Sequence, residues 1–192
     1  MRKKESTKKQ VWLSLVIAFI MVSSILGYMF GRQEPNTVEY NEVRFYQKNF
    51  LWATKIDNKE VVFHNFPSTV EYINVSDYVL SRMKSTLEVD STYDQDNKFV
   101  EDIAVAQHDI ENVFNDFFNI YLRRGLTTEN EFNLPVITCE DATLLVPVLY
   151  FKLGNTTAIY MDNNCIIAEA KSGSDFLKIK DRIIYGLLEI IE

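Results

Sequence analysis

The chain has 192 residues, of which 47% are hydrophobic and 13% aromatic, so a single domain can bury a sizeable core. Its formal charge of −7 is unevenly divided, because residues 1–32 carry +5 and residues 33–192 carry −12. An acidic domain of this kind argues against nucleic acid as a partner and against docking on anionic lipid.

An uncharged run from Val11 to Gly31 follows the basic segment at residues 1–10. As a helix this run is about 30 Å long, which is the thickness of the hydrocarbon core of a bilayer. The excess of lysine and arginine before it predicts a cytoplasmic N-terminus, by the positive-inside rule. We therefore predict a cytoplasmic tail at 1–10, a single-pass transmembrane helix at 11–31 in the cell membrane, and residues 33–192 outside.

Two processed forms compete with this anchor. A cleaved signal peptide has a shorter apolar region, of about 7–15 residues, and small residues at its cleavage site. Here the run is longer, and large residues follow Ser23 and Ser24. A pilin-type leader is cut before the apolar run, usually after a small residue, but Lys8-Lys9-Gln10 occupies that place. We therefore favour an uncleaved anchor.

The first part of the outer domain reads as strands and short helices. After a polar linker at residues 32–41, segments rich in aromatic and β-branched residues predict a small β-meander over residues 42–65. Asp57-Asn58-Lys59 supplies one of its turns. Ser76 is predicted to cap the short helix DYVLSRMK, and the alternation over Thr86–Thr92 predicts a half-buried strand.

The strongest element is a helix predicted from about Lys98 to Arg124, where apolar residues recur at steps of three and four. Gly125 suits its C-cap. The preceding segment, Asp94-Gln95-Asp96-Asn97, begins like a calcium loop but lacks the glycine and the distant glutamate that such a loop requires. We therefore interpret it as the start of the helix.

The final third is rich in strands. Leu134–Cys139 and Leu144–Leu153 predict two strands, and a turn at Gly154-Asn155-Thr156 leads into an antiparallel pair. An amphipathic helix then runs from Ser172 to the chain end. This order predicts an α+β (mixed α/β) fold at residues 42–192, one compact domain with helices packed on a mainly antiparallel sheet.

The two cysteines, Cys139 and Cys165, are too far apart in sequence for a CxxC redox pair. In an oxidising compartment they predict a disulfide, worth about 3 kcal/mol in the chain-entropy model. The alternative is two small buried thiols. The same compartment suits two glycosylation sequons, which begin at Asn155, on a predicted hairpin tip, and at Asn74.

Three segments carry a family resemblance: FHNFPSTVEYINVS, LPVITCEDATLLVPVLYF and NNCIIAEAKSGSDFLKIKDRIIY. They resemble a group of small, uncharacterised archaeal single-pass membrane proteins with an N-terminal anchor and a small extracytoplasmic α/β domain. The resemblance spans most of residues 40–190. The group has no assigned activity, so the resemblance implies no catalytic residue; it supports the anchor and the pairing of Cys139 with Cys165.

Catalytic motifs are missing from the sequence. His64 and His108 are too few for a histidine-rich metal site, and no Walker loop, HExxH, GxGxxG or GxSxG motif is present. We therefore predict no cofactor, no metal ligand and no catalytic residue. The least ordinary cluster is Thr138-Cys139-Glu140-Asp141, whose two acids could act as bases or ligands, although such turns are more often simply solvated.

These observations predict a non-enzymatic function, that of a membrane-anchored extracytoplasmic binding or assembly module. It would contact the lipid bilayer through residues 11–31 and bind an unidentified membrane or envelope protein. The alternative is a membrane-tethered enzyme, a hydrolase or a thiol-dependent protein, that uses the Cys139-Glu140-Asp141 turn. A free Cys139 in a cleft would favour this enzyme, and a Cys139–Cys165 bond would disfavour its thiol-dependent form.

Overall fold

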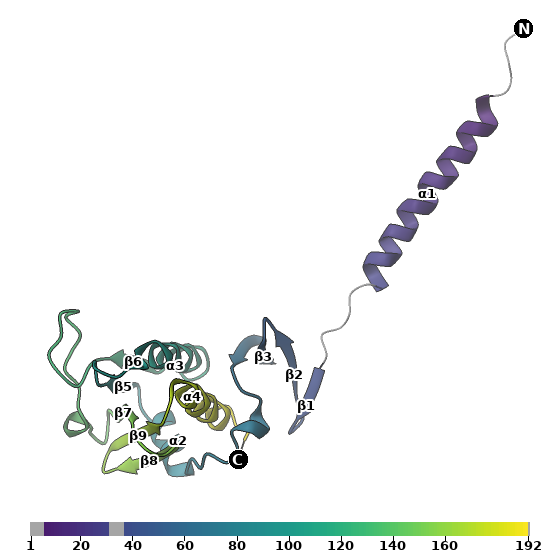
Figure 1. The fold of residues 1–192 in the computed structure, drawn as a ribbon. Helices are drawn as coiled ribbons and strands as arrows, with labels where there is room; N and C mark the ends of the chain where they lie inside the picture. The colour runs from purple at the N-terminus through teal and green to yellow at the C-terminus, as the bar shows by residue number, and fades with distance from the viewer. Residues whose placement is uncertain (1–5, 31–36, 192) are drawn as a thin grey trace, which may run out of the picture. The chain divides into compact units, whose positions relative to one another are not determined.

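The computed structural model describes residues 6–30 and 37–191, and it divides the chain into two units, residues 1–37 and 38–192. The first unit contains the helix α1 (Ser6–Phe30). The second contains all the other helices and all but the first residue of the strands. Each unit is described by itself (Figure 1).

The transmembrane helix predicted at 11–31 is wrong. Among the residues that the structure describes, no helix combines the length and the apolar character that a membrane crossing requires. Residues 1–5 of the predicted tail, Gly31 at the end of the apolar run and residues 32–36 of the predicted linker lie outside the described residues.

The predicted meander is present as a four-stranded sheet, called sheet A here, in the order β1-β2-β3-β4. Its strands are β1 (Thr37–Tyr40), β2 (Val43–Lys48), β3 (Leu51–Ile56) and β4 (Lys59–Phe63). Each connection is a two-residue turn with both residues in the left-handed region, as at Asp57 and Asn58. Such turns match the twist of paired antiparallel strands, and asparagine and aspartate tolerate the conformation.

The second sheet, sheet B, has five strands in the order β6-β5-β7-β9-β8. They are β5 (Glu88–Tyr93), β6 (Tyr121–Arg124), β7 (Val148–Leu153), β8 (Ala158–Asp162) and β9 (Cys165–Ala170). Only β8 and β9 pair antiparallel; the other three pairings are parallel. The prediction of a mainly antiparallel sheet is therefore wrong here. It was drawn from the turns around β8, whereas β7 pairs with β9 and β5 pairs with both β6 and β7 through longer connections.

Three helices of more than one turn complete the domain: α2 (Asp77–Lys84), α3 (Val100–Val113) and α4 (Gly173–Leu187). Ser76 and Ser172 cap α2 and α4, as predicted, by accepting hydrogen bonds from backbone N–H groups. The long predicted helix is shorter than expected, because α3 passes into a π-helical turn at Phe114–Phe118. Its last predicted residues form β6 instead.

Helix α4 is the centre of the domain and lies between the two sheets (Figure 1). Twelve of its residues are buried. On one side Tyr185 stacks on Phe63 of sheet A with 4.1 Å between ring centroids, and on the other Phe176 packs edge-on against Phe151 of sheet B. The hydrophobic core therefore runs from sheet A through α4 to sheet B. Charged residues of α4 are consequently enclosed as well.

Candidate functional site

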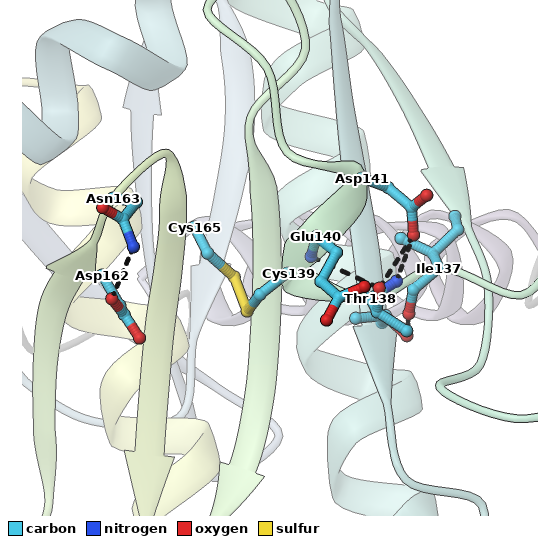
Figure 2. The surroundings of a disulfide bond; sticks show 9 residues. Ile137, Thr138, Cys139, Glu140, Asp141, Asp162, Asn163 and Cys165 are labelled. Atoms are coloured by element: carbon cyan, nitrogen blue, oxygen red, sulfur yellow. Dashed lines mark hydrogen bonds between the residues drawn. A yellow bond between two sulfur atoms is a disulfide. The ribbon is translucent and has the colours of Figure 1, made fainter.

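The Cys139-Glu140-Asp141 turn forms one turn of 3₁₀-helix, η3 (Cys139–Asp141), and contains the predicted disulfide. Cys139 is bonded to Cys165, the first residue of β9, with 5.2 Å between their Cα atoms (Figure 2). The disulfide prediction is therefore confirmed. It leaves no thiolate to act as a nucleophile, which removes the support for thiol chemistry at this turn.

The acids of this turn serve its local structure. Asp141 accepts hydrogen bonds from the backbone N–H and the hydroxyl of Thr138, at 2.8 and 3.0 Å (Figure 2). These bonds lower the pKa of Asp141, and Thr138 in turn accepts from the backbone N–H of Glu140. The arrangement is a capping box. Within residues 6–30 and 37–191, no group of three His, Cys, Asp or Glu residues could hold a metal ion.

A more open feature is the groove between β4 and the end of α3, called the β4–α3 groove here. Its volume is about 180 Å³. The apolar lining comes from Val61, Val62, Val113, Phe117 and Ile184. The polar lining consists of three carboxylates and one amide, from Glu60, Asp109, Asp116 and Asn112. The groove thus combines an apolar floor with acidic walls.

Strand β4 is an edge strand of sheet A, and its outer side faces away from β3. The turn at Asp57-Asn58 makes Ile56 and Lys59 the first hydrogen-bonded pair, and pairing then alternates along the antiparallel ladder. Glu60 and Val62 therefore direct their backbone N–H and C=O groups outward. No other described residue makes a hydrogen bond with these four groups. They form an unpaired strand edge beside the groove.

The groove carboxylates have unequal surroundings. Glu60 is bonded to Lys48 and to Tyr46, and these bonds lower the pKa of Glu60. The same contact raises the pKa of Tyr46 to about 12. Asp116 pairs with Lys59, whose ammonium also lies 5.3 Å from the centroid of the Phe117 ring. Lys59 therefore lies beside the part of the groove wall that Asp116 and Phe117 form.

Asp109 connects the groove to a buried ionic network. Lys180 on α4 has no exposed side-chain surface, and its ammonium lies 2.9 Å from Asp109 and 2.5 Å from Asp181. It also donates to Nδ1 of His64, at 3.2 Å, because an ammonium has no lone pair to accept with. His64 is therefore neutral with its proton on Nε2. Burial lowers the pKa of His64, and the nearby Lys180 charge lowers it further.

Asp181 is fixed by hydrogen bonds from Asn65, which lies two residues after β4. Its Oδ2 accepts from the backbone N–H and the side-chain amide of Asn65, at 2.7 and 2.8 Å. Its Oδ1 forms the ion pair with Lys180 but accepts no hydrogen bond of good geometry. Burial raises the pKa of Asp181, against the opposing influence of Lys180. The network thus fixes α4 against the end of β4 and against α3.

An exposed apolar patch lies at the amino end of sheet B. Its members, called the amino-end patch here, are exposed large side chains: Leu87, Tyr121, Leu144 and Leu145. Leu87 accepts a backbone bond from Tyr121, and the hydroxyl of Thr86 donates to the carbonyl of Leu145, so two loops and the start of β6 bring these residues to the same end of the sheet. The three leucines are 79%, 73% and 80% exposed.

The two sequon asparagines are both exposed. Asn155 lies in the turn between β7 and β8, where its backbone N–H donates to Glu169. Asn74 lies just before α2, and the Ser76 hydroxyl of its sequon caps that helix. Nothing in these positions tests modification, so both sites stay predictions.

Comparison with known proteins gives no relative: no protein-family model, no curated protein and no solved structure matches the chain. The resemblance to archaeal membrane proteins therefore stays a prediction, and the site must be argued from its own geometry. Neither the β4–α3 groove nor the network behind it was predicted. One signal was present, because Lys180-Asp181-Arg182 interrupts the apolar pattern of the last helix with three adjacent charges.

Proposed function

We propose that the domain is a non-enzymatic binding or assembly module that acts outside the cytoplasm. The observation that carries this proposal is the amino-end patch. Isolated exposed apolar residues are ordinary, but several adjacent leucines that are each more than two-thirds exposed favour a surface that is covered by another protein. The fixed loop geometry around Thr86 presents them without rearrangement.

Two further features support this proposal. The Cys139–Cys165 disulfide is typical of proteins in an oxidising compartment. The acidic charge of residues 33–192 favours solubility and disfavours nucleic acid as a partner. The alternative, an enzyme that uses the Cys139-Glu140-Asp141 turn, receives no support from a bonded Cys139 and a capping Asp141.

Site-specific photo-crosslinking in cells tests this function. A photoreactive amino acid at Leu145 should give one discrete crosslinked species, identified by mass spectrometry as a membrane or envelope protein. The matched control is the same amino acid at exposed Lys171, which follows β9 at the opposite, carboxyl end of the parallel strands. Leu87→Ser should abolish the crosslink at Leu145. Equal crosslinking at both positions, or none at either, would contradict the proposal.

A further inference from the structure

The β4–α3 groove has the features of a site for an extended polypeptide. A strand that joins a sheet edge needs unpaired backbone donors and acceptors, and pockets for alternate side chains. Glu60 and Val62 supply two outward N–H and two outward C=O groups. Since these residues are two apart, their groups repeat about every 6.8 Å, which is the spacing at which an added strand presents its own.

The groove next to this edge fits the alternate side chains of such a strand. Phe117 supplies a partly exposed apolar surface beside β4, and the buried Val113 and Ile184 line the groove beneath it. A strand paired with β4 would direct every second side chain toward this surface, because side chains alternate between the two faces of a sheet. These side chains should be apolar and of moderate size, since the volume is about 180 Å³.

The charge of the lining adds a requirement to the same row of side chains, because Asp109 and Asp116 lie on the same helical segment as Val113 and Phe117. All the ionisable groups that line the groove are acids. Oδ2 of Asp109 is occupied by Lys180 and Oδ1 of Asp116 by Lys59, whereas the second oxygen of each carboxylate has no partner among the described residues. Ammonium or guanidinium groups would complete these carboxylates, and an acidic segment would be repelled.

A second hollow, of about 390 Å³, lies between α2 and the end of α4, where Leu80, Lys84 and Glu189 contribute to its lining. Its walls are mainly helical, and helix backbones satisfy their own hydrogen bonds away from their ends. It therefore offers no strand edge and gives no equivalent argument for an extended ligand.

We propose that the β4–α3 groove binds a segment of a partner polypeptide in extended conformation, as an added strand beside β4, with both apolar and basic side chains in the row that faces α3. This inference rests on the proposed binding function and names one partner chemistry for it.

The probe is a capped synthetic peptide of about eight residues, close to the usual length of a strand, in which valine and lysine occupy every second position in turn and threonine fills the positions between them. Its affinity for the full chain is measured by fluorescence anisotropy at low ionic strength, beside the same peptide with glutamate in place of lysine. The lysine peptide should bind at least about tenfold more tightly, and added salt should weaken it. Equal binding of the two peptides, or no binding of either, would overturn the proposal.

The contribution of the strand edge is tested with Val62→Pro and its matched control, Val62→Thr. Proline removes the outward N–H without disturbing the ladder to β3, because that N–H makes no bond within the sheet. Val62→Pro should weaken binding of the lysine peptide about tenfold, whereas Val62→Thr, which keeps the N–H, should bind nearly as tightly as the native chain. Circular dichroism confirms that both variants are folded. Equal affinities would overturn the added-strand geometry.

The contribution of charge is tested with Asp116→Asn, and Glu140→Gln is the matched control on a distant exposed turn. Only the first should reduce affinity for the lysine peptide, by about threefold to tenfold. An unchanged affinity for Asp116→Asn would overturn the acidic-wall argument. Crosslinks at Leu145 do not depend on the groove, so the proposed function can stand where this inference fails, and the reverse also holds.

Discussion

The Oδ2 atom of Asp109 lies 2.9 Å from Nζ of Lys180, so one carboxylate joins the wall of the β4–α3 groove to the buried interior. Lys180 has no contact with solvent, whereas the Asp109 side chain is one-quarter exposed. The ion pair therefore connects a surface feature on α3 to the central helix α4. The position of the groove wall depends on a buried charge.

Lys180→Met should strongly destabilise the protein. It leaves Asp181 buried without its cation, and removing one partner of a buried pair typically costs about 3–5 kcal/mol. The measurement is the free energy of unfolding in urea. The matched control is Lys180→Met with Asp181→Asn, which replaces both charges and should recover most of the loss. A single variant as stable as the native chain would contradict the structural role of this pair.

The pH dependence of stability should reflect His64. Its side chain faces Lys180 and lies near Asp181, Asp109 and Asp102, and burial lowers its pKa in the folded state. The folded state therefore favours neutral His64, so this contribution is fully present above the unfolded pKa of about 6.5 and is lost as the pH falls below it. His64→Gln should reduce the loss of stability between pH 7.5 and 5.5.

The effect of His64 on the pH dependence of stability must be separated from that of Asp181, because the raised pKa of Asp181 changes stability with pH in the opposite direction. An acid that is protonated more readily in the folded state contributes stability that decreases as the pH rises. The measurement is therefore the difference between native and His64→Gln unfolding curves, since Asp181 is common to both. His108→Gln, on the solvent-exposed face of α3, should behave like the native chain. Identical pH profiles for all three would contradict the prediction.

Local signals in the sequence predicted the structure correctly where a single residue type determines the backbone conformation. Asp57-Asn58 predicted a turn, and both residues are left-handed; Ser76 predicted a cap, and it accepts the bond from Val79. These signals failed where pairing with a segment that is distant in the sequence determines the secondary structure. The apolar stripe that continued through Tyr121 predicted helix, but this segment pairs in parallel with β5. Propensity is a weak prior against such tertiary pairing.

The candidate site depended on long-range placement throughout. Glu60 and Asp109 are far apart in sequence, and nothing local indicates that β4 lies beside α3 or that its outer edge is unpaired. Lys180 in an amphipathic pattern is normally read as solvent-facing. It is buried because α4 has a sheet on either side, a consequence of the two-sheet arrangement and not of the helix itself.

Removal of the disulfide should destabilise the domain. The bond closes a loop with a sequence separation of 26, for which the chain-entropy model gives about 3 kcal/mol. It holds η3 against a small apolar cluster on sheet B that includes Ile137, Val148 and Ile167. Cys139→Ala with Cys165→Ala should therefore lower the free energy of urea unfolding by about this amount. Native chain in a reducing buffer is the control and should lose the same stability.

Gly173 lies against the Asp102 carboxylate of α3, so a larger side chain at this position must displace that carboxylate. A Cβ at Gly173 would overlap Oδ2 and Cγ of Asp102, at the first residue of α4. Because the overlapping atoms are the end of a side chain that can rotate away, Gly173→Ala should cost at most about 1 kcal/mol of unfolding free energy, the low end of the range for overpacking. This loss should occur although alanine has the higher helix propensity.

A double-mutant cycle identifies the cause. Asp102→Ala removes the overlapping carboxylate, so the cost of Gly173→Ala should largely disappear in that background. Asp102→Ala alone also removes a negative charge from the positive end of α3, which should cost only about 0.3–1 kcal/mol. A Gly173→Ala penalty that persists without the Asp102 carboxylate would show that the close approach of α3 and α4 at this point is not what requires glycine.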